Sequence, residues 1–137
     1  MRLFTRKRKT IRSFHFETYK EFAREIITSR VEHFNAYYHF AFGRIAIKNQ
    51  KRCWGSCSAK KNLNFNYKVI FLPETLMDYV IVHELCHLKE LNHGQQFWDL
   101  VSEMVPDYKE KRAHLKRITS VPTSGFPSSV FAAQKQM

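Results

Sequence analysis

The spacing of apolar residues predicts a long helix in the first third of the chain. From about Glu17 to Phe40, apolar positions recur at steps of three and four and form one stripe, with most charged side chains off it. The stripe consists of Tyr19, Ala23, Ile26, Ile27, Val31, Phe34 and Tyr38. Gly43 follows the pattern and is a suitable residue to end the helical segment. We therefore expect an amphipathic helix that packs one face against the rest of the protein.

The middle of the chain changes to a period of two, which is typical of half-buried strands. Residues 44–48, RIAIK, alternate, and a second alternating segment starts at Leu63, continues to Leu72 and stops at Pro73. Between them lies KRCWGSCSAKKN, which contains many turn-forming residues and predicts a turn at residues 54–56. We expect a small antiparallel or mixed sheet. Residues 63–69 are either a plain strand of this sheet or an edge strand that pairs with an extended substrate.

Three helical segments follow Pro73. Thr75 is a candidate cap for the first, whose stripe consists of Leu76, Tyr79, Val80, His83, Cys86 and His87. The second runs from about His93 to Val105, before Pro106, and the third is a basic segment over about residues 108–118. This order of helix, sheet and helices predicts an α+β fold. We expect one domain over residues 14–118, a flexible basic arm over 1–13 and a disordered Ser/Pro-rich tail over 119–137.

Composition narrows the class of protein. A chain of 137 residues with 44% apolar residues can form one globular domain with its own core. Its apolar runs are shorter than a membrane helix, and the basic N-terminal segment lacks the apolar region of a secretory signal. We therefore expect a cytoplasmic protein with no membrane partner, in which Cys53, Cys57 and Cys86 are reduced thiols.

The net charge of +11 is unevenly distributed. Residues 1–12 carry six cations and no acid, residues 33–73 carry seven cations and no acid, and residues 109–117 carry five cations against Glu110. Such a surface attracts polyanions, including nucleic acid and nucleotide phosphates. Because no recognised nucleic-acid motif accompanies the charge, a simple solvated basic surface remains the alternative.

The chemistry is concentrated in HELCH, residues 83–87. Residues four apart lie on one helix face, so His83 and His87 can bind the same ion. Glu84 points elsewhere and is poorly placed as a ligand, but it lies close enough to contact a water on that ion. This is the H-E-x-x-H pattern of zinc hydrolases, in which zinc acidifies the water and the glutamate takes its proton. The sequence therefore predicts one zinc ion per chain, with Glu84 as the general base.

A catalytic zinc needs a third protein ligand and one open position. His93 is the first candidate, but six residues after His87 correspond to a rotation of roughly 240° on a helix. The helix must therefore end near residues 91–92, with Asn92 able to adopt a left-handed conformation. His93 would then open the next helix, with Phe97 and Trp98 packing below it. Glu103, Glu110 and, less favourably, Glu90 are the alternatives. We expect Cys86 to fill the core, Tyr108 to pack at a helix start, and Ser56 or Arg52 to belong to a structural turn with a possible substrate contact.

Four ordered motifs resemble the YgjP-like family of small HExxH proteins. They are WGSCS from Trp54, LNFN from Leu63, YVIVHELCHLKELNHGQQFW from Tyr79 and PDYKEKRAHLK from Pro106. The resemblance covers roughly residues 44–116. The HGQQF element from His93 is also similar to one in SprT-like zincins, which process proteins attached to DNA.

The resemblance implies a minimal zincin-like fold, with zinc held by His83, His87 and His93 and with Glu84 as the base. It also implies a metallopeptidase or a related metal-dependent hydrolase, and one relative is described as a UTP pyrophosphatase. Three functions are therefore open: a zinc hydrolase acting on peptides, a metal-dependent nucleotide pyrophosphatase, and a non-enzymatic zinc-stabilised module that binds nucleic acid or protein. An intact Glu84 favours the first two, because a structural zinc site needs no base.

Overall fold

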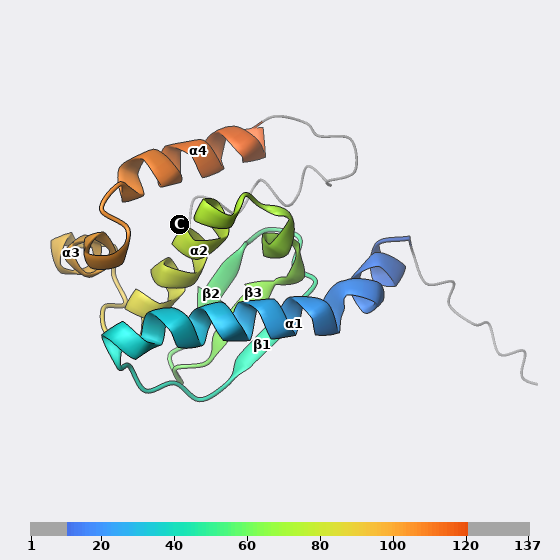
Figure 1. Cartoon of the computed structure of the whole chain (residues 1–137), viewed down its shortest axis with the longest axis horizontal. Coiled ribbons are helices and arrows are strands. Elements are labelled where there is room, and N and C mark those ends of the chain that lie inside the picture. The colour runs from blue at the N-terminus through green and yellow to red at the C-terminus, as the bar shows by residue number, and fades with distance from the viewer. Residues whose placement is uncertain (1–10, 121–137) are drawn as a thin grey trace, which may run out of the picture.

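The computed structural model describes residues 11–120, in which four helices surround a three-stranded sheet (Figure 1). The helices are α1 (Ile11–Tyr38), α2 (Glu74–Cys86), α3 (Gln95–Met104) and α4 (Tyr108–Ser120). The strands are β1 (Ile45–Lys48), β2 (Gly55–Cys57) and β3 (Leu63–Asn66), and a short 3-10 helix, η1, spans Tyr67–Phe71. The predicted α+β class is confirmed. Most of the predicted basic arm and tail, residues 1–10 and 121–137, lie outside the described residues, and α1 already begins at Ile11.

The sheet has the strand order β1-β3-β2, so β3 lies in the centre. β1 pairs with β3 in parallel, with Ile45 opposite Leu63, and β2 pairs with β3 antiparallel, with Ser56 opposite Asn64. The turn predicted at residues 54–56 is therefore wrong, because Gly55 and Ser56 belong to β2. Of the two possibilities for the segment from Leu63, the plain strand is found and the edge strand is not, because β1 and β2 form the two edges of the sheet. Three residues are too few to show a period of two, so only pairing with β3 reveals β2.

The second alternating segment forms a strand only as far as Asn66. The Asn66 side chain accepts a hydrogen bond from the Lys68 backbone N–H at 3.1 Å and donates to the carbonyls of Gln50 and Cys53 at 2.8 and 3.1 Å. These bonds cap η1 and fix the chain where the strand ends. The predicted extension to Leu72 is therefore wrong, because an asparagine side chain can replace ladder bonds with local ones. Asn66 is buried rather than solvent-facing.

The end of α1 also differs from the prediction. The helix stops at Tyr38, and His39 takes the left-handed conformation, with φ of 57°, that commonly follows a helix. The Asn35 side chain bonds both the N–H and the carbonyl of Phe40 at 2.9 Å, which satisfies the chain after the helix. Gly43 instead lies further on, where a Cβ atom would come within 2.3 Å of the Asn62 Oδ1 atom.

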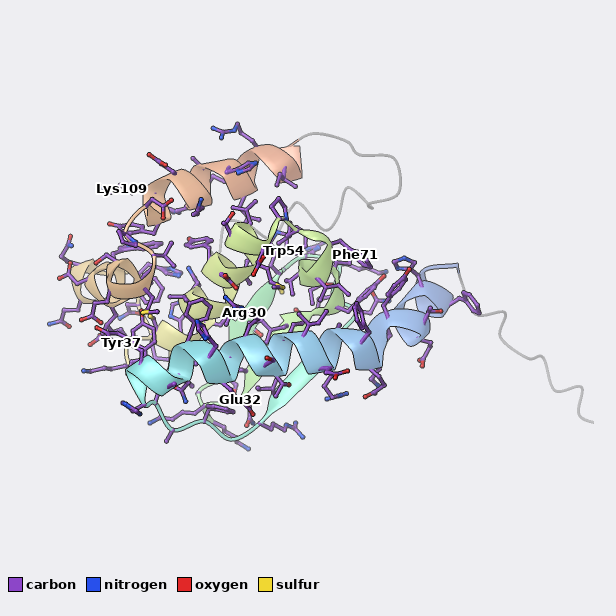
Figure 2. All side chains as sticks on the ribbon, in the orientation of Figure 1. Arg30, Glu32, Tyr37, Trp54, Phe71 and Lys109 are labelled. Atoms are coloured by element: carbon purple, nitrogen blue, oxygen red, sulfur yellow. The ribbon has the colours of Figure 1, made fainter. Side chains whose placement is uncertain are left out.

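Helix α2 is the centre of the molecule, with α1 on one side and α4 on the other (Figure 1). Apart from the half-buried Asp78, every residue from Leu76 to Leu88 is buried, so this part of the helix has no exposed polar face. Pro73 rather than Thr75 occupies the cap position, and no side chain caps the helix. A bidentate ion pair joins α1 to α2, with Arg30 donating to both Asp78 carboxylate oxygens at 2.9 and 2.8 Å (Figure 2). Over residues 11–120, none of the helices combines the length and the apolar character needed to cross a bilayer.

Candidate metal centre

The last turn of α2 places two imidazoles side by side. His83 lies inside the helix and His87 is its C-cap residue, and their ring centroids are 4.8 Å apart. Both side chains are buried, and the ring of Phe97 from α3 packs against each of them. The expected pair at a spacing of four is therefore held in an apolar surrounding, which fixes the directions of the two rings.

His93 reaches the same point from the loop after α2. The helix ends at Cys86, one turn earlier than residues 91–92, and a turn over residues 87–89 reverses the chain. Asn92 is not left-handed, since within residues 11–120 only His39 and Lys61 are non-glycine residues with positive φ. His93 does not open the next helix either, because Gly94 is the N-cap of α3. The loop, rather than a continuous helix, therefore brings the His93 ring to the same side as His83 and His87.

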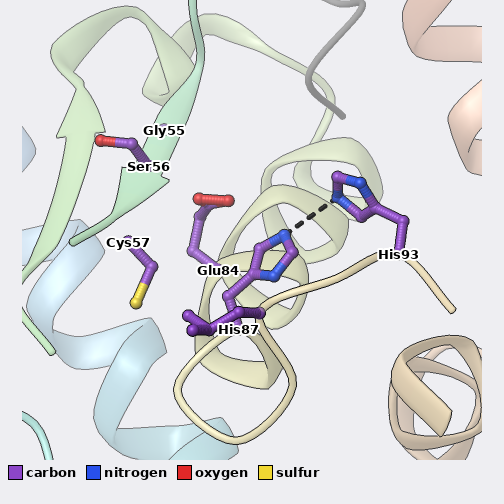
Figure 3. A pocket seen from close by; sticks show the side chains of 7 residues that line it. Gly55, Ser56, Cys57, Glu84, His87 and His93 are labelled. Atoms are coloured by element: carbon purple, nitrogen blue, oxygen red, sulfur yellow. Dashed lines mark hydrogen bonds between the residues drawn. The ribbon is translucent and has the colours of Figure 1, made fainter. Parts of the chain in front are cut away.

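The three imidazoles converge through the same ring atom. Figure 3 shows two of them, His87 and His93, with the contact between their rings drawn as a dashed line. The Nε2 atoms of His83 and His87 are 3.2 Å apart, those of His87 and His93 are 3.0 Å apart, and those of His93 and His83 are 3.2 Å apart. Two ligands at about 2.0–2.1 Å from a tetrahedral zinc lie roughly 3.3 Å from each other. The triangle therefore has nearly the dimensions of one face of a zinc coordination tetrahedron.

The hydrogen bond made by the outward nitrogen of His87 leaves its inward nitrogen able to bind a cation. The Nδ1 atom of His87 lies 2.9 Å from the Glu90 carbonyl oxygen, which can only accept, so Nδ1 carries the proton and Nε2 presents a lone pair. On the other side, Nδ1 of His83 faces the Tyr79 hydroxyl at 3.5 Å, a long contact. In the neutral tautomer fixed at His87, the inward nitrogen is an acceptor, and an ion between the rings satisfies it.

Burial also keeps these rings neutral, as metal binding requires. The pKa of His83 is lowered well below its ordinary value, chiefly by burial and then by the neighbouring His87 and His93. The pKa values of His87 and His93 are lowered as well, in both cases first by burial. A neutral imidazole is the form that coordinates zinc. The chemistry of the donor set therefore fits one zinc ion.

Glu84 faces a small pocket beside the three rings. The pocket has a volume of about 200 Å³ and is lined by Gly55, Ser56, Cys57, Glu84, His87, Leu91 and His93. The Glu84 carboxyl group is 3.9 Å from the His83 Nε2 atom, and its other oxygen, Oε2, is buried without a hydrogen-bond partner within the described residues. Burial raises the pKa of Glu84 to about 8. A raised pKa makes this carboxyl group, once ionised, a stronger base than an exposed glutamate.

Strand β2 approaches this glutamate closely because residue 55 is a glycine. A Cβ atom at Gly55 would lie 3.0 Å from the Glu84 Cγ atom and 3.1 Å from the Asn64 carbonyl oxygen. The strand, seen with Ser56 and Cys57 opposite Glu84 in Figure 3, therefore forms the wall of the pocket that faces α2. The WGSCS motif suggested a turn with a possible substrate contact, and the structure shows that its place is the pocket wall.

The remaining candidates lie outside the triangle of rings. Within the described residues, the histidine group contains neither Glu103 nor Glu110, and Glu90 contributes its carbonyl oxygen rather than its carboxylate. Cys86 is buried, as expected, and Tyr108 stacks on Trp98 with centroids 4.9 Å apart. Phe97 and Trp98 pack beside His93, as expected, with ring centroids 5.1 and 5.9 Å from the His93 ring. One residue near the rings was missed, namely Arg112, which lies 5.3 Å from the Trp98 ring centroid. Its position depends on how α4 packs, and no local pattern encodes it.

A sheet above a helix that carries two histidines and a glutamate, with a third histidine from the next loop, is the arrangement of a zincin-type metallohydrolase domain. Comparison with known proteins agrees with this class. The model of the YgjP-like family, described as a metallopeptidase domain, matches residues 3–118. The chain therefore belongs to the YgjP-like family.

Two solved structures share the fold. The metallopeptidase zymogen abylysin of Pyrococcus abyssi is similar with a TM-score of 0.62 and 23% identity, over 72% of this chain and 99% of that chain. The metallopeptidase zymogen jannalysin of Methanocaldococcus jannaschii is similar with a TM-score of 0.58 and 28% identity, over 69% of this chain and 95% of that one. Among curated proteins, the UTP pyrophosphatase of Escherichia coli (strain K12) is 42% identical over 38 residues. That match spans 28% of this chain and 23% of the relative.

Proposed function

We propose that this protein is a zinc-dependent metallopeptidase that binds one zinc ion through His83, His87 and His93 and uses Glu84 as its general base. The convergence of three Nε2 atoms within 3.2 Å of one another is the observation that carries the proposal. The metallopeptidase family and the metallopeptidase neighbours support the same activity. The free thiols of Cys53, Cys57 and Cys86 agree with a reducing compartment such as the cytoplasm.

Zinc in this site would polarise the scissile carbonyl and activate a water molecule. The residues of the chain do the rest. The Glu84 carboxyl group, buried beside the pocket, would take up the proton of the attacking water and return it to the leaving amine. The buried Phe97 ring, which stacks on His87, would hold this ligand in place and exclude water from behind it.

The free edge of β2 offers a place for an extended peptide. Trp54 accepts a backbone hydrogen bond from Asn66, and Ser58 donates one to Asn62, so alternate residues of this strand bond to β3. In an antiparallel pair with this register, the backbone groups of Gly55 and Cys57 point away from β3. Because both residues line the pocket, a substrate strand paired there would run past Glu84.

A nucleotide pyrophosphatase is the second candidate. The similarity to the UTP pyrophosphatase favours it, and so do the cations Arg44, Lys48, Lys51, Arg52, Lys60 and Lys61, all exposed on the loops and strands around the site. Such cations could bind phosphates. The same charge could serve nucleic acid, which is the third candidate, a zinc-stabilised binding module without turnover.

A substrate screen with a matched pair of variants separates these functions. We expect zinc-loaded wild-type protein to cleave casein or short peptides, and Glu84→Gln to keep its zinc while turnover falls about 100-fold or more. Glu103→Gln, which changes an exposed glutamate of α3, should leave turnover unchanged. Hydrolysis of UTP without peptide cleavage would select the second function. Salt-dependent DNA binding without any turnover would select the third, and full activity of Glu84→Gln would rule out the proposed base.

A further inference from the structure

An arginine occupies the inward face of α4. Arg112 follows Tyr108 by four residues and precedes Leu115 by three, so the three side chains share one side of the helix. Tyr108 packs on Trp98 and Leu115 is 2% exposed, so this is the side that covers α2 and α3. Arg112 itself is exposed. Arg112 therefore lies on the packing side of α4, yet its side chain stays open to solvent and can meet a ligand.

The surroundings of Arg112 connect it to the metal centre. Its guanidinium carbon lies 5.3 Å from the centre of the Trp98 ring. The same ring lies 5.9 Å from the rings of both His83 and His93. In agreement with this geometry, the charge of Arg112 adds to burial in lowering the pKa values of His83 and His93. The guanidinium group is therefore one aromatic ring away from two of the three candidate zinc ligands.

We propose that Arg112 recognises an anionic group of the substrate, a carboxylate or a phosphate, next to the bond that is cleaved. This inference rests on the proposed hydrolase function and adds a substrate class to it. An extended peptide advances about 3.3–3.6 Å per residue, so a guanidinium one ring away from the zinc ligands reaches a group one or two residues from the scissile bond. Guanidinium groups bind planar oxyanions through paired hydrogen bonds, and the aromatic face of Trp98 holds the group in place.

A purely structural role would need only the contact with Trp98. Arg112→Met keeps most of that packing and removes the charge. Arg112→Lys keeps the charge but loses the planar guanidinium group that makes paired hydrogen bonds. Arg117 provides the matched control. It lies on the same helix, about 140° around the axis from Arg112, and its change to methionine removes the same charge.

The experiment measures binding to zinc-loaded protein in the Glu84→Gln background, which prevents turnover of the probe. Two pairs of probes are compared by calorimetry. One pair is a short acetylated peptide with glutamate beside the scissile amide and its glutamine analogue, and the other is UTP and uridine. We expect at least one anionic probe to bind about tenfold or more tightly than its neutral partner, since charge-assisted hydrogen bonds are strong. Arg112→Met should remove this preference, Arg112→Lys should keep part of it, and Arg117→Met should leave it unchanged.

The outcomes separate the two claims. A preference in the peptide pair alone identifies a carboxylate, and a preference in the UTP pair alone identifies a phosphate; either supports the inference when it depends on Arg112. Equal binding within both pairs, or a preference that survives in Arg112→Met, overturns it. Zinc content and the melting temperature of each variant show whether the fold is intact. Failure of the hydrolase proposal would appear separately, as absence of turnover in wild-type protein that still shows the preference.

Discussion

At the scale of single residues, a backbone carbonyl decides the chemistry of the site. The Glu90 carbonyl oxygen accepts a hydrogen bond from the Nδ1–H group of His87 at 2.9 Å, so the other ring nitrogen keeps a lone pair for a metal. This contact depends on the turn after α2, since in a continuous helix the Glu90 carbonyl would accept a hydrogen bond from a backbone N–H group instead. The turn after α2 therefore orients the His87 ring for the metal site that we propose.

The contribution of His93 is the first prediction at this scale. His93→Ala removes one corner of the triangle, so we expect zinc affinity to fall by more than the roughly 10–100-fold that loss of an outer hydrogen-bond partner costs. The measurement is a competition titration with a chromogenic chelator. His114→Ala, which removes an exposed histidine of α4, is the control and should bind zinc like the wild type. Unchanged affinity in His93→Ala would mean that another residue completes the site.

Residue-level features could be predicted from sequence only where spacing carries the information. His83, Glu84 and His87 follow from a five-residue motif, because a helix fixes which side chains meet. His93 could be named as a candidate but not separated from Glu103 and Glu110, since the path of the loop after α2 is a tertiary property. Trp98 could be expected beside His93, since both were placed at the start of the same helical segment. Arg112 gave no signal, because it approaches the site only through the packing of α4.

At the scale of elements, the contact between β2 and α2 forms the pocket. The strand is three residues long and lies at the edge of the sheet, and it approaches the helix at Gly55. Neither fact is visible in the sequence, where the glycine and serines indicate a turn. The alternating pattern after Leu63 was misleading for a related reason, because the Asn66 side chain ends the strand with local hydrogen bonds.

We expect Gly55→Ala to separate metal binding from activity. The new methyl group would meet the Glu84 Cγ atom at 3.0 Å and the Asn64 carbonyl at 3.1 Å, so β2 or the glutamate must move. Overpacking of this kind costs about 1–3 kcal/mol of stability, and turnover should fall while zinc stays bound. Turnover, zinc content and urea unfolding are the readouts. Gly94→Ala has no atom within 4 Å of its new Cβ atom and is the control. Normal turnover in Gly55→Ala would show that the close approach is not needed.

The Arg30–Asp78 ion pair joins α1 to α2 and leads to a stability prediction. Its side chains are 27% and 19% exposed, and both bonds are 2.9 Å or shorter. Arg30→Met should lower the free energy of unfolding by about 1–2 kcal/mol, because it leaves a half-buried carboxylate without its partner. Glu21→Gln breaks the more exposed pair with Arg24 and should change stability by less than about 0.5 kcal/mol. Similar unfolding midpoints for both variants would contradict this difference.

At the scale of the whole molecule, the long buried helix α2 organises the protein around the metal centre. The order of elements and the α+β class could be predicted because periods of 3.6 and 2 residues are local properties of the chain. The strand order could not, since pairing between β1, β3 and β2 depends on contacts across the fold. Exposed cations lie on the loops on either side of β2 and on α4, for example Arg52, Lys60 and Arg112, so the substrate class depends on this surface as well as on the motif.

The central claim is that three imidazoles hold one zinc ion and leave one position open. X-ray absorption at the zinc edge, on protein loaded with one equivalent of zinc, tests it most directly. We predict three imidazole nitrogens and one oxygen at about 2.0–2.1 Å from the zinc ion, with one nitrogen lost in His93→Ala. Sulfur ligation at about 2.3 Å, or fewer than three imidazoles in the wild-type protein, would contradict it.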